Sequence, residues 1–356
     1  MLAQVHFPQS LSGEELDRYL SEGWFRMGQT IFTTNFLNFK QQFYSAIWLR
    51  IRLKECAPTR LEEKLIRLNS GFSVELTKAK IDQEKENLFA RYRAQVSFEP
   101  SSSLQALLFG RATENVFDTL EVTVRDNGKL IGCGFFDLGK KSTAGISSFY
   151  DPDYKKHSLG KFLIHQKILF SRDRGYEFFY PGYFVPGYSP FDYKLKIYPT
   201  AQEYFDLATS RWQPMHQFSA DETPLAVMHR KLEALSQQLK SLQVPSSILR
   251  YEFYDANLVP DLSHMELFDF AVFLQYFDFF ENAINSLVVY DVRDQRYHWM
   301  IVKSVWKSDQ LAQADDSYAA HLLKVEEEVI SATDATEMAE ILAMAIRSKV
   351  FSQKLG

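Results

Sequence analysis

Cysteine is scarce in this chain of 356 residues, which contains only Cys56 and Cys133. The two lie far apart in the sequence, and neither forms part of a CxxC pair. This excludes a disulfide framework, and the low cysteine count fits a reducing, cytoplasmic environment.

Several other signals are also missing. The first residues contain no basic region followed by an apolar run, so we expect no signal peptide. The most apolar stretch, Leu267 to Val289, is interrupted by Asp269, Asp278 and Glu281, which argues against a membrane span. We find no HExxH motif, glycine-rich phosphate loop or Ser/His/Asp nucleophile pattern, and we predict no metal site.

Apolar residues are abundant, since 46% of the chain is hydrophobic and 15% is aromatic. That is enough for a large core in two or three domains. The net charge of −5 is unevenly distributed. Basic residues exceed acidic ones by 5 in residues 37–80 and again in 155–196, whereas residues 215–340 carry a net charge of −12. The two basic segments indicate either a basic face or ordinary variation of surface charge.

Local patterns predict several elements at the two ends of the chain. In the first hundred residues we expect three helices and a strand, at 12–21, 59–69, 82–94 and 45–53 respectively. In the last 140 residues, Thr223-Pro224 opens a helix whose apolar residues, spaced three and four apart, should dock on the body. We also expect a hairpin over 287–302, a terminal helix over 337–349, and core positions for the aromatic residues of 268–280.

The middle of the chain has the clearest pattern. Strands are predicted at 120–125 and 129–137, because Asp126-Asn127-Gly128 between them is a strong hairpin turn. A third strand at 145–150, a helix at 160–171 and a strand at 176–180 then form a β-α-β unit with its two strands parallel. An antiparallel run entering such a unit is the core topology of GNAT-like acyltransferases, which is an analogy of fold alone.

The turn from the third strand into the helix carries the chemistry. It runs from Phe149 through Asp151-Pro152 to Ser158-Leu159-Gly160, with Lys155, Lys156 and Lys161 around it. The first N–H groups of a helix have no partner within the helix and favour an anionic or polarised oxygen. The alternative is an ordinary capped helix behind a turn.

The whole string, with the motifs after it, resembles the C-terminal domain of arginyl-tRNA–protein transferases and their bacterial leucyl-transferring relatives. The family motifs occur here in the same order and spacing: Tyr150-Asp151-Pro152, Ser158-Leu159-Gly160, the aromatic strand Tyr176 to Tyr180, Gly182-Tyr183 and Tyr193-Lys194. Arg91-Tyr92 resembles the start of that domain. Leu20, Gly23, Trp24 and Arg26 resemble, more weakly, the opening of the family's N-terminal domain.

The resemblance implies aminoacyl transfer from a charged tRNA to the N-terminal amine of an acceptor protein. The donor ester is already activated, so positioning, an oxyanion donor and a proton path would suffice without a cofactor. Asp151 would hold or deprotonate the acceptor ammonium, Tyr180 or Tyr183 would relay a proton, and the N–H groups of Leu159 and Gly160 would bind the oxyanion. Candidates for substrate and tRNA binding are Arg26, Tyr154, Lys155, Ser158, Lys161, Gly182, Tyr193 and Lys194.

The sequence departs from the family in one respect, because residues 28–46 contain no cysteine where the family has a cysteine cluster. Two rival functions stay open. One is a GNAT acetyltransferase using acetyl-CoA, which Phe162 disfavours because a phosphate loop needs a small residue there. The other is a tRNA- or peptide-binding relative without activity.

The prediction is an α+β protein with a GNAT-like mixed-sheet acyltransferase core. We expect an N-terminal α/β transferase domain at 1–85, the catalytic domain at 86–214, and an α+β extension at 215–356 that is helical with a hairpin. Expected partners are aminoacyl-tRNA, as co-substrate, and the N-terminus of an acceptor protein, with no membrane and no cofactor. The transferred amino acid, arginine or leucine, and the oligomeric state stay open.

Overall fold

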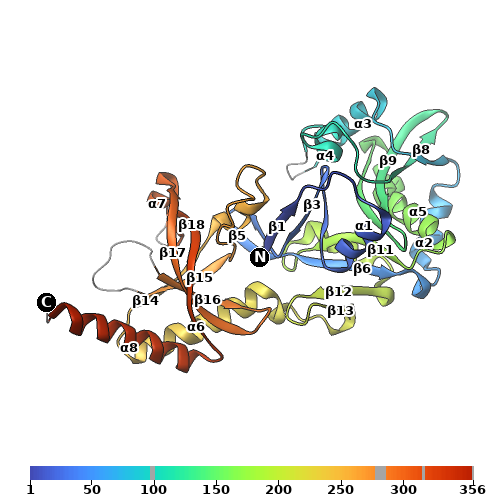
Figure 1. The fold of residues 1–356 in the computed structure, drawn as a ribbon. Coiled ribbons are helices and arrows are strands. Elements are labelled where there is room, and N and C mark those ends of the chain that lie inside the picture. Colours follow the sequence, from blue (N-terminus) through green and yellow to red (C-terminus); the bar gives the residue numbers. More distant parts are fainter. Residues whose placement is uncertain (97–100, 277–285, 315–316, 355–356) are drawn as a thin grey trace.

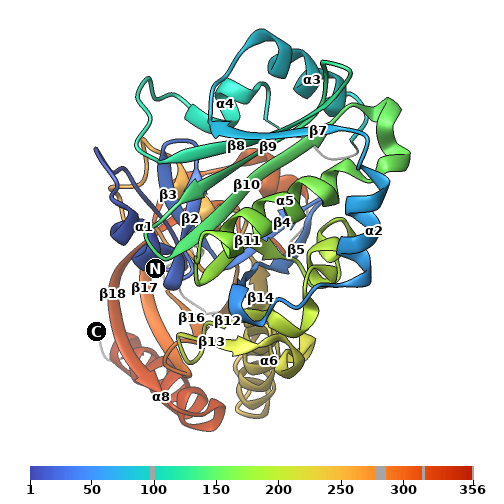
Figure 2. The ribbon, with the colours of Figure 1, turned by 90° about the vertical axis from the view of Figure 1, so that its right-hand side faces the viewer.

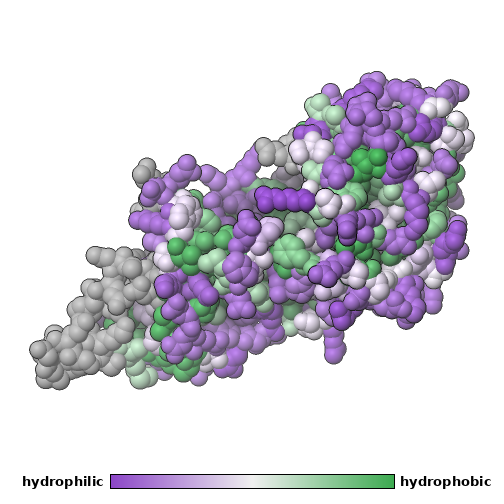
Figure 3. Space-filling view, turned by 45° about the horizontal axis from the view of Figure 1, so that its top comes forward, coloured by the Kyte–Doolittle hydropathy of each residue, from purple (hydrophilic) through white to green (hydrophobic). Residues whose placement is uncertain are grey.

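The computed structural model describes the whole chain apart from residues 97–100, 277–285, 315–316 and 355–356. It has a body and an extension, which the long helix α6 (Pro224–Ser241) connects (Figure 1). Figure 3 shows one face of the molecule as mainly hydrophilic, with hydrophobic residues in small separate groups. Among the described residues, no helix has the length and apolarity needed to cross a membrane.

A mixed eight-stranded sheet forms the centre of the body. Its strands, in spatial order, are β13 (Arg211–Pro214), β12 (Gln202–Asp206), β6 (Ile47–Arg52), β11 (Phe178–Phe184), β10 (Ser142–Tyr150), β9 (Lys129–Leu138), β8 (Thr119–Asp126) and β7 (Ser73–Lys78). Only the β10–β11 pairing is parallel among the pairings described for this sheet. The predicted hairpin through Asp126-Asn127-Gly128 and the parallel strands after it are therefore confirmed.

Helices cover both faces of this sheet (Figure 2). On one face lie α5 (Leu159–Asp173) and α2 (Arg60–Leu68), with Leu159 and Phe162 packed on β8 and β9. On the other face lie α3 (Gln83–Arg93) and α4 (Leu104–Phe109), which pack on the opposite side chains of β9 and β10. Alternate side chains of β9 therefore belong to two hydrophobic cores, one on each face of the sheet, as expected for a sheet between two layers of helices.

Two smaller sheets complete the N-terminal part of the body. One contains β1 (Ala3–His6), β3 (Thr30–Thr34) and β2 (Phe25–Met27), and the other pairs β4 (Phe36–Phe39) with β5 (Gln42–Ser45). Helix α1 (Gly13–Ser21) begins with a capping box, in which Ser12 and Glu15 each accept a backbone hydrogen bond from the other. This confirms the predicted helix at 12–21. Strands β6 and β7, from the predicted first domain, belong to the central sheet, so one sheet spans both predicted domains.

The extension is a five-stranded antiparallel sheet backed by two helices. Its strands are β14 (Ser246–Arg250), β15 (Val272–Tyr276), β16 (Ser286–Asp291), β17 (Arg296–Lys307) and β18 (His321–Ala332). The two helices are α6 and α8 (Ala335–Lys354), and the short α7 (Asp309–Ala314) lies between β17 and β18 in the sequence. The predicted hairpin is confirmed as β16–β17, and so is the docking of α6, whose Met228, Leu232, Leu235 and Leu239 are buried against the sheet.

The extension also packs on the N-terminus of the chain. Leu2, Phe36 and Phe43 lie in the same core as the extension sheet. The buried carboxylate of Asp269 accepts hydrogen bonds from the backbone N–H groups of Leu2 and Ala3. Phe268 and Phe273 are core residues, as predicted, whereas the end of that aromatic stretch lies outside the described residues. The extension is therefore joined to the body by a shared core.

Candidate functional site

The central sheet opens where strands β10 and β11 part. Their parallel pairing runs only from Ser142–Phe178 to Ala144–Tyr180. Beyond that point β10 stays paired with β9, with a bulge between Gly145 and Ser147, and β11 stays paired with β6. Strand ends that separate in this way leave backbone groups unpaired between them, and a substrate can pair with those groups.

Lys167 of α5 holds the bulge in β10. Its amine donates hydrogen bonds to the carbonyl of Phe135 at 2.9 Å, the carbonyl of Ser147 at 2.6 Å and the hydroxyl of Ser148 at 3.0 Å. Burial lowers the pKa of Lys167 to about 7. Nothing in the spacing of α5 distinguishes Lys167 from a surface lysine, so the sequence does not predict this role. Its position follows only from the register of α5 on the sheet.

The start of α5 faces the parting of the strands. Ser158 has a left-handed backbone, with φ of 52°, and its side chain makes no capping hydrogen bond. Leu159 and Gly160 form the first turn, whose N–H groups have no acceptor within the helix. A Cβ at Gly160 would lie 3.3 Å from the ring of Tyr150, so this ring rests on the helix start.

Asp151 follows β10 and is fully buried. Its carboxylate pairs with Lys129 at 2.8 Å and Arg91 at 2.8 Å, and it accepts a hydrogen bond from the N–H of Asp153 at 3.1 Å. Burial opposes ionisation, but the Lys129 hydrogen bond, the Asp153 N–H and the Arg91 charge outweigh it and lower the pKa of Asp151. Both oxygens are thus occupied, so in this structure Asp151 anchors the turn instead of offering a free base, contrary to the role expected for it.

Lys194 packs against two aromatic rings beside β11. Its amine donates a hydrogen bond of 2.6 Å to the carbonyl of Tyr183 and lies 5.3 Å and 5.2 Å from the ring centres of Tyr183 and Phe191. Gly182, with φ of 82°, leaves room for it, because a Cβ there would lie 3.3 Å from the amine. Burial lowers the pKa of Lys194 to about 7. We expected a phosphate-binding lysine, but the structure places this amine at the parting of the strands.

Three tyrosines, Tyr92, Tyr150 and Tyr193, form a cluster near the same place. The rings of Tyr92 and Tyr150 are 5.6 Å apart. Burial, with the neighbouring phenol of Tyr92, raises the pKa of Tyr193 to about 12, although 38% of its surface is exposed. Burial also raises the pKa of Tyr92, so Tyr92 and Tyr193 stay protonated at neutral pH and offer hydroxyl donors. Tyr92 was noted only as part of the family's domain start.

The two tyrosines proposed as proton relays differ in their surroundings. Tyr180 is 3% exposed, packs edge-on against Trp212 and lies near Arg50. Burial raises its pKa to about 12, and its position in the core argues against contact with a substrate. Tyr183 is only partly buried and packs on Trp48 and Phe191, with its pKa raised by burial.

Arg26 has a packing role instead of the expected contact with tRNA. Its side chain is 3% exposed, and it pairs with the fully buried Asp137 at 2.8 Å. It also donates to Thr119 at 2.9 Å and to the carbonyls of Gly28 and Leu108 at 2.6 Å each. All these acceptors are internal, so the guanidinium is unavailable to a phosphate. The weaker resemblance at this position therefore marks a fold-stabilising arginine.

The remaining predicted residues lie on the outer side of the turn. Lys155 and Lys161 are exposed, and Tyr154 is partly buried with its hydroxyl donating to Asp126 at 2.8 Å. The described residues hold no group of three or more His, Cys, Asp or Glu side chains arranged to bind a metal ion.

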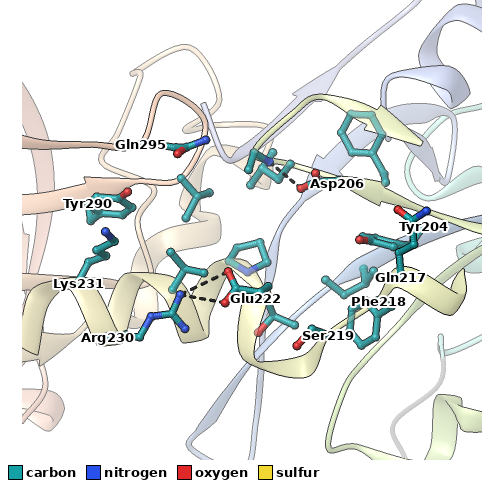
Figure 4. Close-up of a pocket in the computed structure, with 18 residues that line it drawn as sticks. Tyr204, Asp206, Gln217, Phe218, Ser219, Glu222, Arg230, Lys231, Tyr290 and Gln295 are labelled. Carbon is teal, nitrogen blue, oxygen red and sulfur yellow. Dashed lines mark hydrogen bonds and ion pairs between the residues drawn. The ribbon is translucent and has the colours of Figure 1, made fainter. Parts of the chain in front are cut away.

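A separate pocket of about 470 Å³ lies between the body and the extension (Figure 4). It is lined by β12, the start of α6 and the turn between β16 and β17. Arg230 pairs with Glu222 at 3.1 Å on its wall, and Lys231 lies over the ring of Tyr290. None of the site residues predicted from the sequence lines this pocket.

Known proteins resemble part of this chain. The family model described as arginine-tRNA-protein transferase, C terminus, matches residues 84–203. A protein of Leptospira interrogans named aspartate/glutamate leucyltransferase is 33% identical over 202 residues, which are 55% of this chain and 76% of that protein. A protein of the same name from Stenotrophomonas maltophilia is 24% identical over 57% of this chain and 79% of that protein.

The chain belongs to the aminoacyl-tRNA–protein transferase family. It is an enzyme of the aminoacyltransferase class, as the sequence motifs indicated. Residues 84–203 of this transferase contain every predicted site residue except Arg26. The enzyme's donor is accordingly an aminoacyl-tRNA and its acceptor a protein.

Solved structures resemble the transferase only distantly. One is the C-terminal domain of a lysylphosphatidylglycerol synthetase from Agrobacterium fabrum. The match covers 39% of this chain and 47% of that one, with 16% identity and a TM-score of 0.32. Another is the ribosomal-protein-S18-alanine N-acetyltransferase of Escherichia coli. The match covers 29% of this chain and 62% of that one, with 19% identity and a TM-score of 0.23. These scores carry no argument about function, and the GNAT-like assignment stays a prediction.

Proposed function

We propose that this transferase moves leucine from Leu-tRNA to the N-terminal amine of a protein that begins with Asp or Glu, in the cytoplasm. The observation that supports leucine most is the match to 76% of the length of an aspartate/glutamate leucyltransferase at 33% identity. The description of the family model mentions arginine, but that model matches only residues 84–203. Arginyl transfer is therefore the alternative to test.

The proposed reaction forms a C–N bond and breaks an ester C–O bond. The neutral α-amine of the acceptor attacks the carbonyl carbon of the aminoacyl ester, and the terminal ribose oxygen leaves with a proton. We place the carbonyl oxygen at the first turn of α5, where the N–H groups of Leu159 and Gly160 can stabilise developing negative charge. The donor ester is already activated, so the proposed reaction needs no cofactor.

The acceptor amine must first lose a proton, and Lys194 is the better proton acceptor of the two candidates. An amine whose pKa is about 7 is partly neutral at physiological pH, which suits general base catalysis. The carboxylate of Asp151 is held by Lys129 and Arg91, and its lowered pKa makes it a weak base. We propose that Tyr183, whose raised pKa keeps it protonated, supplies the proton to the leaving ribose oxygen.

The structure also disfavours the acetyl-CoA alternative. In the pyrophosphate loop of an acetyl-CoA enzyme, the position of Phe162 would face a phosphate. Here Phe162 is 3% exposed and packs in the core between α5 and the sheet. A phosphate at this position would have to displace a buried aromatic ring.

A transfer assay tests the proposal. Purified protein is incubated with labelled Leu-tRNA, Arg-tRNA or acetyl-CoA, and with peptides that begin with Asp, Glu, Lys or Ala. We expect label from Leu-tRNA on the Asp and Glu peptides. Label from Arg-tRNA alone would replace leucine by arginine, and label from acetyl-CoA alone would end the proposal.

A further inference from the structure

Helix α2 presents a basic side to solvent. Arg60, Lys64 and Arg67 are exposed, with Glu63 as the exposed acid on the same helix. Ile66 and Leu68 add exposed apolar surface of 44% and 38%. Exposed apolar residues of this kind are ordinary on a protein surface, so the cations are what distinguishes this side of the helix.

The C-terminal end of α2 lies against the turn that leads into α5. The side chain of Asn69 donates a hydrogen bond to the carbonyl of His157 at 3.2 Å, and the ring of His157 lies 3.4 Å from the carbonyl of Leu68. Both ribbon views place the two segments together (Figures 1 and 2). Two basic segments of the sequence, far apart along the chain, therefore meet on one side of the body.

The combined surface carries six exposed cations, namely Arg60, Lys64, Arg67, Lys155, Lys156 and Lys161. Within the part of the chain that the structure describes, none of them forms an ion pair. We call these six the basic surface. Exposed cations without acidic partners attract a polyanion, which releases its counterions when it binds.

A pocket of about 460 Å³ borders this surface, since Lys156 belongs to both. Three aromatic rings line it: Phe72 lies 4.9 Å from His157 and 5.9 Å from Tyr154, measured between ring centres. Lys156 and Lys129 lie at its wall, together with the carboxylates of Asp126 and Asp153. Asp126 accepts a hydrogen bond from the hydroxyl of Tyr154, which fixes that ring.

We propose that the basic surface binds the phosphate backbone of the donor tRNA and that the aromatic pocket holds one of its unstacked bases. Aromatic rings beside cations are the combination that holds single-stranded RNA, because rings stack on bases while cations contact phosphates. The carboxylate of Asp126 already accepts hydrogen bonds from Tyr154 and Asn127, and its remaining lone pairs can accept from a base amino group but not from a phosphate. An acidic acceptor protein would use the cations and leave the rings without a function.

This inference rests on the proposed transfer reaction for its partner, but it is tested separately by binding. The dissociation constant of uncharged tRNA is measured at several salt concentrations for the full-length protein. For Lys64→Ala/Arg67→Ala we expect weaker binding and a salt-dependence slope reduced by about 2, roughly one for each lost phosphate contact. The matched control is Lys303→Ala/Lys307→Ala, two exposed lysines on β17 of the extension, for which we expect an unchanged slope.

The outcomes separate the inference from the reaction. An unchanged slope in the α2 variant, or an equal loss in the β17 control, would overturn the basic surface. A variant that raises KM for the acceptor peptide and leaves tRNA affinity unchanged would assign the surface to an acidic protein, which also overturns it. If the wild-type protein transfers nothing yet binds tRNA through this surface, the proposed reaction fails and the inference stands.

The pocket is tested with a short single-stranded RNA that carries a fluorescent adenine analogue, whose emission falls when it stacks. We expect quenching by the wild-type protein and much weaker quenching by Phe72→Leu/His157→Ala. The leucine preserves the apolar contact with the core below, and thermal unfolding verifies that the variant is folded. Equal quenching by both proteins, or none by the wild type, would overturn the assignment of a base to this pocket.

Discussion

The ionisation of Lys194 depends on what surrounds its amine. Aromatic rings and a single carbonyl acceptor cannot stabilise a full positive charge as water does, so burial lowers its pKa to about 7. Asp151 illustrates the opposite case, since its cationic partners keep a fully buried carboxylate charged. The sequence motif includes both residues, but it does not show that Asp151 anchors the turn whereas Lys194 is the proposed base.

Replacement of Lys194 by Met should therefore reduce kcat by about 10²-fold, the usual size of a general base contribution. In the wild type, kcat should rise as pH increases through about 7, because only the neutral amine accepts a proton. Lys194→Met should lose this dependence. The measurement is a pH–rate profile of both proteins at saturating tRNA.

The Lys194→Met replacement should also change how the free energy of unfolding depends on pH. Between about pH 7 and the ordinary lysine pKa of 10.5, Lys194 binds a proton in the unfolded chain but not in the folded chain, so it makes the free energy of unfolding rise with pH. Lys194→Met should remove this contribution and leave the similar contribution of Lys167 in place. The exposed neighbour Lys196, replaced by Met, is the control and should leave both profiles unchanged. Full activity in Lys194→Met would refute the proposed role.

Arg26 permits a second prediction at the residue scale. Arg26→Met should lower the free energy of unfolding by about 3–5 kcal/mol, because it leaves the fully buried Asp137 without its charge partner. The double variant Arg26→Met/Asp137→Asn should recover part of this loss, as a double-mutant cycle would show by urea unfolding. A large loss of tRNA affinity in a variant of normal stability would instead support the original tRNA-binding hypothesis.

At the scale of elements, the parting of β10 and β11 depends on the bulge and on the helix beneath it. Lys167 reaches from α5 to the carbonyls of Phe135 in β9 and Ser147 in β10, the strand partners that directly follow that bulge. The same helix begins at Leu159, where the proposed oxyanion donors lie. One helix therefore fixes both the width of the opening and the position of the donors.

Lys167→Met should remove the donor for the carbonyls of Phe135 and Ser147. Each buried acceptor left without a partner costs about 1–3 kcal/mol, so the melting temperature should fall. We expect kcat to fall as well at temperatures where the variant is folded, because the bulge loses its support. Lys161→Met, an exposed position on the same helix, serves as the control for stability. Unchanged stability of Lys167→Met would show that the bulge does not need this amine.

At the scale of the whole molecule, the extension shares a core with the first residues of the chain. Leu2, Phe36 and Phe43 pack among residues of the extension, and Asp269 binds the start of β1. The extension was predicted as an accessory part, but its removal would expose these side chains to water.

A chain that ends at residue 214 should consequently be less stable than the full chain and prone to aggregation. A smaller perturbation than truncation is Leu232→Ala, at a fully buried position in α6. We expect it to lower the free energy of unfolding by about 2–5 kcal/mol. Chemical unfolding of both proteins measures the effect. A truncated protein that is soluble, cooperative and active in transfer would show that the body folds without the extension.

Local patterns in the sequence were sufficient for the elements whose cause is local. Ser12 and Glu15 cap their own helix, and Asp126-Asn127-Gly128 turns the hairpin without help from distant residues. The family motifs likewise identified the segment from Tyr150 to Lys194, because functional side chains occupy fixed positions along the chain. Strands such as β7, β14 and β18 were missed, since pairing with distant strands decides them.

The sequence alone therefore determined the family, the β-α-β unit and the residues that carry its motifs, since these follow from neighbouring residues. Only the tertiary structure decided what each residue does. It buried Arg26 against Asp137, paired Asp151 with Lys129 and Arg91, and surrounded Lys194 with aromatic rings. The physical reason is that charge and proton affinity depend on partners from distant parts of the chain, which meet only in the fold.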